Sequence, residues 1–257
     1  MSRIKKLFDK KKQDILSIYF TAGFPALEDT IPVLHALQEA GADMIELGVP
    51  YSDPLADGPV IQRSGSRALA NGMSIATLFE QLKEFRNEIH IPVLLMGYMN
   101  PVMQYGFDRF CQEAATLGID GLILPDLPAM EFETEFGKII RKAGLDFVFL
   151  VTPETSDQRV KKLDELSSGF LYAVSSSSTT GKHAVLDNQE VYFRRLRGLR
   201  LKNPVMIGFG IRDRQSFYSA CRQAQGAIVG TAFIEALEKE GSGDIGTRCK
   251  NFIQSLR

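Results

Sequence analysis

Two carboxylates lie where a buried core would not place them, and their positions suggest acid–base chemistry. Glu46 falls within DMIELGV (residues 43–49), an apolar segment typical of a strand buried on both faces. A buried carboxylate is costly unless it is paired or functional. Alternate residues of a strand share a face, so Glu46 points inward if Ile45 and Leu47 pack against helices. We interpret Glu46 as a general acid/base with a raised pKa; a structural ion pair is the alternative.

The segment after this strand holds the second carboxylate. It is PYSDPLADGP (residues 50–59), and its three prolines stiffen it. A rigid loop can hold a charged group over a site at little entropic cost. Asp57 is therefore a candidate for stabilising a charge that develops during a reaction, with a turn role as the alternative. Asp53, which precedes Pro54, is better explained by a turn.

Three glycine-containing turns follow later strand-like segments and predict a phosphate site. They are Thr180-Gly181, Gly208-Phe209-Gly210 and Gly230-Thr231. Glycine lets backbone N–H groups approach an anion closely, and a helix that starts there adds a favourable dipole. We expect such a short helix over residues 231–237, because phosphate sites in barrels commonly use one. The alternative is that these glycines serve only the turns.

Other polar residues lie at strand ends or inside strands. Tyr172 shares a strand face with Phe170 and Val174, and it is either a core tyrosine or a member of the site. Asn100 and Asp126 follow two further strand-like segments, and we expect them to shape the site or an interface.

Short apolar segments alternate with longer amphipathic ones along the chain, and this alternation must position the candidate residues. Eight buried strands are expected, at residues 15–20, 43–49, 93–98, 121–125, 147–151, 170–175, 205–209 and 226–230. Apolar stripes at helical spacing lie between them, for example at residues 75–85, 107–117 and 132–143. Gly118 and Gly144 follow two stripes as helix-ending glycines. Helix N-caps are expected at Ser74, Ser156 and Asp213.

Alternating strands and helices imply parallel strands joined by right-handed crossovers. Eight such units can close into a barrel, and 257 residues fit one barrel. We therefore predict an α/β fold, a single (β/α)8 TIM barrel domain over residues 1–257 with a short N-terminal helix. An open doubly wound sheet is the rival. It usually carries Gly-x-Gly-x-x-Gly after its first strand, whereas residues 21–25 are TAGFP.

Composition argues against several classes of function. The formal net charge is -1 at pH 7 and the isoelectric point is about 6.3, which argues against nucleic acid as a partner. The basic run at residues 5–12 is interpreted as the solvated side of the leading helix. No apolar segment approaches the ~20 residues of a membrane span. The first residues lack the apolar core of a signal peptide, so we expect a cytoplasmic protein.

The cysteines and histidines predict neither disulfides nor a metal site. Cys111, Cys221 and Cys249 are far apart in the sequence and form no Cys-x-x-Cys pair, so we expect free thiols. The three histidines share no metal-like spacing with one another or with a cysteine.

Taken together, these segments resemble the α subunit of tryptophan synthase. The most specific stretch is IELGVPYSDPLADGP (residues 45–59), which is similar to that family's signature almost letter for letter. Shorter motifs agree in order and spacing: TAG (21–23), GYMNP (97–101), PDLP (125–128), TTG (179–181), GFGI (208–211) and GTA (230–232). The likeness covers essentially the whole chain.

The resemblance implies a barrel that cleaves indole-3-glycerol phosphate to indole and glyceraldehyde 3-phosphate by a retro-aldol reaction, with no cofactor of its own. It implies that Glu46 is the essential acid/base and that Asp57 holds the indole N–H. It places Tyr172 near Glu46, and Tyr19 in the indole pocket, where the family usually has Phe. The implied phosphate cradle comprises Gly181, Phe209, Gly210, Gly230 and Thr231, the last being more often Ser. Thr180 matches a loop threonine that reaches the Asp of the second loop.

The resemblance also implies a protein partner. This is a β chain that carries pyridoxal phosphate, in a complex of two α and two β chains. The loops at residues 100–101 and 126–128, with the second and sixth loops, would form the contact face.

Two rival functions stay open at this point. One is another phosphate-binding barrel lyase or isomerase, since a fold does not fix a function. The other is a non-catalytic regulatory subunit. Intact Glu46 and Asp57 argue against both. The sixth loop is SSSSTTG (residues 175–181), whereas the family usually has Ser-Arg-x-Gly-Val-Thr-Gly, and this departure keeps the regulatory alternative open.

Overall fold

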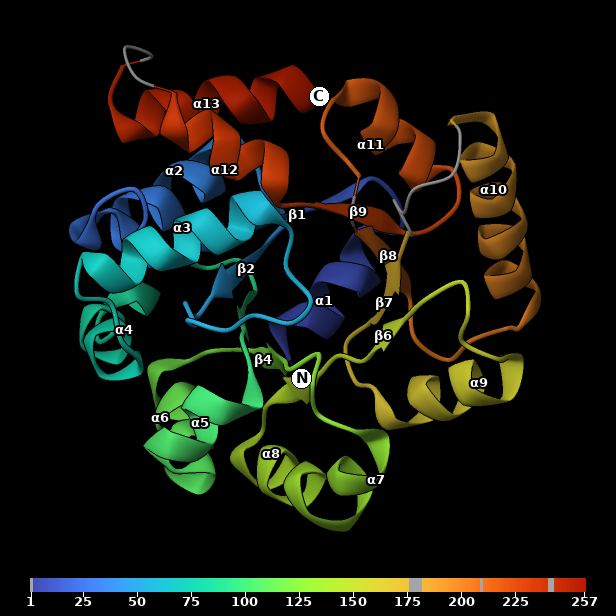
Figure 1. Ribbon diagram of the computed structural model, residues 1–257, viewed down its shortest axis with the longest axis horizontal. Helices are drawn as coiled ribbons and strands as arrows, with labels where there is room; N and C mark the ends of the chain where they lie inside the picture. Colours follow the sequence, from blue (N-terminus) through green and yellow to red (C-terminus); the bar gives the residue numbers. More distant parts are fainter. Residues whose placement is uncertain (1, 176–181, 209, 240–242) are drawn as a thin grey trace.

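A computed structural model of the chain describes residues 2–175, 182–208, 210–239 and 243–257. Its strands are parallel and hydrogen-bonded in the order β5-β4-β3-β2-β1-β9-β8-β7-β6. They are β1 (Ile15–Thr21), β2 (Met44–Gly48), β3 (Val93–Met96), β4 (Gly121–Ile123), β5 (Asp146–Phe147), β6 (Leu150–Val151), β7 (Leu171–Val174), β8 (Val205–Gly208) and β9 (Gly226–Val229). The strands form the centre of the molecule and the helices surround them (Figure 1).

The fifth predicted strand is split in two. Its first half, β5, pairs with β4, and its second half, β6, pairs with β7. The two residues between them continue both pairings, because Val148 N donates to Leu122 O (3.1 Å) and Phe149 O accepts from Tyr172 N (3.0 Å). Residues 146–151 thus join the two ends of the sheet. The eight expected strand positions close into a ring, and the predicted (β/α)8 barrel is confirmed.

Helices occupy the outside of the barrel and alternate with the strands. They are α1 (Arg3–Lys10), α2 (Thr30–Ala40), α3 (Pro59–Ala70), α4 (Ile75–Gln81), α5 (Met99–Tyr105), α6 (Phe107–Leu117), α7 (Ala129–Glu131), α8 (Gly137–Ala143), α9 (Asp157–Leu166), α10 (Lys182–Gly198), α11 (Arg214–Cys221), α12 (Thr231–Glu238) and α13 (Ile245–Leu256). The expected stripe at residues 132–143 begins with one π-helical segment, Phe132–Phe136. Over the described ranges, no helix combines the length and apolar character needed to span a bilayer.

Predicted helix boundaries agree with the structure. The side chains of Ser74, Ser156 and Asp213 each accept a hydrogen bond from a backbone N–H in the first turn of the helix that follows. Gly118 and Gly144 end their helices in the left-handed region, with φ of 91° and 80°, where a side chain would be strained.

Apolar side chains form two separate clusters, one on each face of the sheet. The outer cluster, between strands and helices, contains Ile45 and Leu47 of β2. The inner cluster fills the barrel and contains Met44 of the same strand. The alternation expected for this strand is confirmed. The inner cluster also receives Ile4 and Phe8 from α1, which precedes β1 and so covers the N-terminal end of the barrel.

Candidate active site

Glu46 lies near the C-terminal end of β2, on the inner face of the barrel, and its side chain is fully buried. Ser17 Oγ on β1 donates a hydrogen bond to Glu46 Oε1 (3.0 Å), and no described residue donates to Oε2. Burial raises the pKa of Glu46 to about 8, against the opposing effect of the Ser17 hydrogen bond. No described cation pairs with Glu46, so the structural ion pair considered above is not supported.

Asp57 lies on the loop between β2 and α3, and Tyr98 holds this part of the loop. The Tyr98 hydroxyl accepts a hydrogen bond from Ala56 N (3.1 Å) and forms another with the Asp57 carboxylate. Burial raises the pKa of Asp57, and the Tyr98 hydrogen bond opposes that rise. Asn100 contacts the start of the same loop, since its Nδ2 donates to the Tyr51 hydroxyl (2.8 Å).

Tyr19 and Tyr172 extend from β1 and β7 into the same region. Each lies over a glycine on the neighbouring strand. A Cβ atom at Gly48 would lie 2.3 Å from the Tyr19 hydroxyl oxygen, and one at Gly208 would lie 2.1 Å from that of Tyr172. Burial raises the pKa of both phenols, and the charges of Glu46 and Asp57 raise them further. The structure therefore brings both carboxylates and both tyrosines close together.

A cavity of about 460 Å³ opens among these groups, at the C-terminal ends of the strands. This volume falls in the usual range for small-molecule sites. Six of the predicted site residues line it, namely Tyr19, Asp57, Tyr172, Gly210, Gly230 and Thr231. Glu46 is not in the lining, although both lining tyrosines interact with its charge. Arg212 and Glu235 are the other charged residues of the wall.

The helix α12 begins at the cavity wall. It spans Thr231–Glu238, close to the predicted 231–237, and Gly230 is its N-cap residue. Gly230, Thr231 and Ala232 all line the cavity. The first backbone N–H groups of a helix and its dipole favour an anion at this end.

Comparison with known proteins identifies the family to which the chain belongs. The family model described as "Tryptophan synthase alpha chain" matches residues 5–255. The chain belongs to the tryptophan synthase alpha chain family.

Individual relatives agree over the full length. The chain is 51% identical over 259 residues to the tryptophan synthase alpha chain of Flavobacterium johnsoniae, covering 100% of both chains. Its structure is similar to that of tryptophan synthase subunit alpha from Legionella pneumophila, with a TM-score of 0.91 and 36% identity over 100% of this chain and 97% of that one. It is also similar to a chain of the tryptophan synthase complex from Pyrococcus furiosus (TM-score 0.85, 35% identity, 96% and 98% coverage).

Some predicted site positions of this family member lie outside the described residues. Thr180, Gly181 and Phe209 are among them, so the cradle is described only at Gly210, Gly230 and Thr231. Ser175 is the one residue of the sixth loop that the structure describes, and its Oγ donates to Gly208 O (3.1 Å). Asp126 accepts from Met99 N (3.0 Å) at the start of α5, and β3 ends at Met96, two residues before the predicted end at residue 98.

Sequence reasoning missed two residues that hold the carboxylates. Ser17 alternates with Tyr19 on the inner face of β1, and the available signal was a hydroxyl side chain within a mostly apolar strand. Tyr98 lies in the strand-end motif GYMNP. Its role was not predicted, because its contact with Ala56 joins residues 42 positions apart. No cluster of three or more metal-binding side chains occurs among the described residues.

Proposed function

We propose that this member of the tryptophan synthase alpha chain family cleaves indole-3-glycerol phosphate to indole and glyceraldehyde 3-phosphate, with Glu46 as acid/base. One observation carries the proposal. Glu46 is a fully buried carboxyl with one unpartnered oxygen, next to tyrosines that line a cavity at the C-terminal end of the barrel. Barrel enzymes perform their chemistry at this end.

The raised pKa of Glu46 suits both proton transfers of this reaction. With a pKa of about 8, the carboxyl is mostly protonated at neutral pH and can give its proton to C3 of the indole ring. The resulting carboxylate then takes the proton of the hydroxyl on the adjacent side-chain carbon. The electrons of that O–H bond form the aldehyde C=O, and those of the breaking C–C bond return to the ring. Glu46 ends the cycle protonated.

The other residues stabilise the charges that this reaction creates. Protonation at C3 makes the ring nitrogen more acidic, so the Asp57 carboxylate beside the N–H favours the transition state. Tyr98 fixes Asp57 for this task. Tyr19 and Tyr172 would contact the indole side of the substrate. Gly210, Gly230 and Thr231, with the start of α12, would bind the phosphate, and Thr180, Gly181 and Phe209 complete the cradle that the family resemblance implies.

We further propose that the chain acts with a β chain, which holds pyridoxal phosphate, and needs no cofactor of its own. A partner surface is supported by three exposed apolar side chains. Leu55 on the second loop is 87% exposed, Met103 on α5 is 49% exposed and Met130 at α7 is 72% exposed. Each lies in a segment that follows the C-terminal end of a strand. Large exposed apolar side chains are typical of interfaces.

Residues 1–257 are proposed to form one barrel domain that works in the cytoplasm. The three cysteines support this location, because all are buried and unpaired. Free thiols persist where the compartment is reducing.

The experiment that tests the catalytic proposal measures glyceraldehyde 3-phosphate released from indole-3-glycerol phosphate, with and without a β chain. Glu46→Gln removes the titrating group and keeps its shape, so we expect a loss of roughly 10²–10⁴-fold in kcat. Glu39→Gln, at an exposed position of α2, is the matched control and should keep full activity. Absence of cleavage by the unsubstituted chain, even with an active β chain, would refute the lyase and leave the regulatory alternative.

A further inference from the structure

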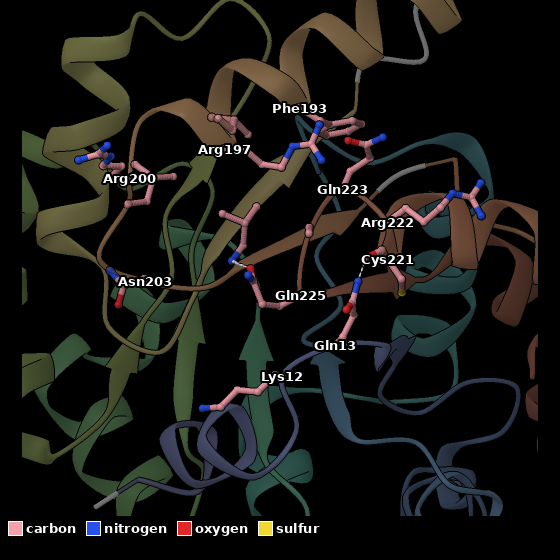
Figure 2. Close-up of a pocket in the computed structure, with 14 residues that line it drawn as sticks. Lys12, Gln13, Phe193, Arg197, Arg200, Asn203, Cys221, Arg222, Gln223 and Gln225 are labelled. Carbon is pink, nitrogen blue, oxygen red and sulfur yellow. Dashed lines mark hydrogen bonds between the residues drawn. The ribbon is translucent and has the colours of Figure 1, made fainter.

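A second cavity, of about 380 Å³, lies at the opposite end of the barrel. It is bounded by Lys12 and Gln13 just before β1, by Val205 at the start of β8, and by Gln225 just before β9. These are N-terminal strand ends, whereas the cavity at Glu46 lies at C-terminal ends. Helix α10 contributes Leu196 and, as Figure 2 shows, Phe193 and Arg197, and the segments at residues 200–203 and 221–224 complete the wall.

The wall of this cavity is strongly basic. Its charged members are Lys12, Arg197, Arg200 and Arg222, and it contains no carboxylate. In the described part of the chain, neither Arg197 nor Arg200 has an ion pair or a hydrogen-bond partner for its guanidinium. Among the residues that the structure describes, Arg222 donates only to Ser219 Oγ (3.3 Å). Figure 2 shows the Arg197 side chain pointing toward Gln223, with Arg200 and Arg222 toward opposite edges.

Carboxylates near the cavity do not neutralise these cations. Asp164 accepts hydrogen bonds from the backbone N–H groups of Lys202 and Asn203 and from the Asn203 amide. Asp14 interacts with the thiol of Cys221. Asp9 approaches Lys12 only at 3.9 Å and is shared with Lys5. Three arginines therefore face a cavity without a protein anion, and guanidinium groups bind phosphate through paired N–H donors.

Polar side chains in the same cavity indicate a second property of a ligand that would fit it, besides its negative charge. Two glutamines are fixed, because Gln13 Nε2 donates to Cys221 O (2.9 Å) and Gln225 Oε1 accepts from Val205 N (2.7 Å). Gln223 differs, since its Oε1 is buried and has no described hydrogen-bond partner. A buried acceptor without a donor is costly, and a ligand hydroxyl would satisfy it.

We propose that this cavity binds a small hydroxylated organic phosphate, at a site separate from that of Glu46. The phosphate contacts Arg197, a hydroxyl of the ligand donates to Gln223 Oε1, and the carbon skeleton packs on Phe193 and Leu196. Arg200, Arg222 and Lys12 strengthen the attraction from the rim. The volume of about 380 Å³ is sufficient for a ligand of this size.

Residue-resolved amide NMR during titration with glycerol 3-phosphate tests the proposal. Glycerol 3-phosphate is also expected to bind at the predicted phosphate site at the start of α12. The measurement must therefore distinguish binding at the two ends of the barrel. We expect saturable shifts at α10, at α11 and at the side-chain amide of Gln223, independent of those at Gly230. Glycerol, which lacks the charge, and sodium chloride at matched ionic strength should not reproduce them. Malonate tests whether any dianion suffices.

The variant Arg197→Gln/Arg200→Asn removes two cations. Asn is chosen because residue 200 has φ of 51°, a region that Asn tolerates. We expect affinity at this end to fall about tenfold or more, with the response at Gly230 unchanged. Arg194→Gln, on the same helix but paired with Glu190, is the matched control and should bind normally. If the double variant does not fold, Arg222→Gln replaces it.

Three results would overturn the proposal. The first is the absence of saturable shifts at α10 and α11. The second is equal shifts with sodium chloride or malonate, which would show charge screening or an unselective anion patch. The third is unchanged binding in folded variants that lack the arginines.

Discussion

Glu46 owes its chemistry to burial in a place that offers one hydrogen bond. Ser17 donates to one oxygen, the other lacks a described donor, and none of the described cations pairs with it. Desolvation therefore dominates, and it moves the pKa of this carboxyl to about 8. A paired carboxylate would be held ionised and would have no proton to give. The lack of a neighbouring cation is thus as important for the acid role as the carboxyl itself.

The same residue should make stability depend on pH. Its folded-state pKa of about 8 exceeds the ordinary value of 4.5, so the folded chain binds this proton more tightly than the unfolded chain. The stabilisation is fully present below 4.5 and is lost as the pH rises through 8. Glu46→Gln removes the titration, so the variant should gain stability relative to the parent by up to about 1.4 kcal/mol per pH unit across this window.

Urea unfolding of both proteins between pH 5 and about pH 9 measures this difference. Glu39→Gln at an exposed position should give a difference that does not change with pH. A stability difference between Glu46→Gln and the parent that is also constant with pH would show that Glu46 is ionised in the folded chain.

The strand β2 shows how a single element combines packing with chemistry. Its alternation sends Ile45 and Leu47 to the helices, and Met44, Glu46 and Gly48 into the barrel. Gly48 leaves room for the Tyr19 hydroxyl, just as Gly208 on β8 leaves room for Tyr172. The two glycines therefore determine where the tyrosines of the candidate site lie.

Gly48→Ala should displace Tyr19, because the new methyl group would lie 2.3 Å from its hydroxyl oxygen. We expect a loss of about 1–3 kcal/mol in the free energy of unfolding, as for overpacked cores, together with a raised KM for indole-3-glycerol phosphate. The measurements are urea unfolding and steady-state kinetics. Gly198→Ala, where no atom lies within 4 Å of the added carbon, is the control and should change neither quantity appreciably. Normal stability and kinetics in Gly48→Ala would contradict this account.

At the scale of the whole molecule, the two ends of the barrel have different tasks. The C-terminal end carries the carboxylates, the tyrosines and the cavity at α12. The N-terminal end is covered by α1, whose Phe8 ring lies 6.2 Å from that of Phe170. Asp120 adds to this end, since it is buried and accepts from Arg3 (3.1 Å) and Arg86 (2.5 Å).

Phe8→Ala should therefore weaken the fold without changing the chemistry. Truncating a buried phenylalanine typically costs about 3–5 kcal/mol, and Phe8 is only 8% exposed. The kcat of the folded protein should stay at the parent value, because the active end is unaffected. Denaturant unfolding and kinetics below the unfolding transition check both parts. Lys6→Ala on the solvent side of α1 is the control. An unchanged unfolding free energy for Phe8→Ala would mean that α1 does not support the barrel.

Several features of this protein follow from the sequence by itself. Short buried strands alternate with amphipathic helices, and this local pattern is sufficient to predict a parallel barrel. The alternation of residues along 43–49 was sufficient to predict that Glu46 points into the barrel. The glycines and prolines predicted where the loops lie. These are properties of neighbouring residues, which is why they can be inferred without coordinates. The signature at residues 45–59 and the motifs that follow it carried the family resemblance.

Other features required the tertiary structure, because they depend on residues far apart in the chain. The Ser17 contact with Glu46 joins positions 29 apart, and the Tyr98 contact with Ala56 joins positions 42 apart. The split of the fifth strand into β5 and β6 arises where the ring closes, with one half pairing to β4 and the other to β7. The basic cavity at the N-terminal end gathers Lys12, Arg197 and Arg222 from three separate segments. No local pattern records such distances, since only the closed barrel brings these side chains together.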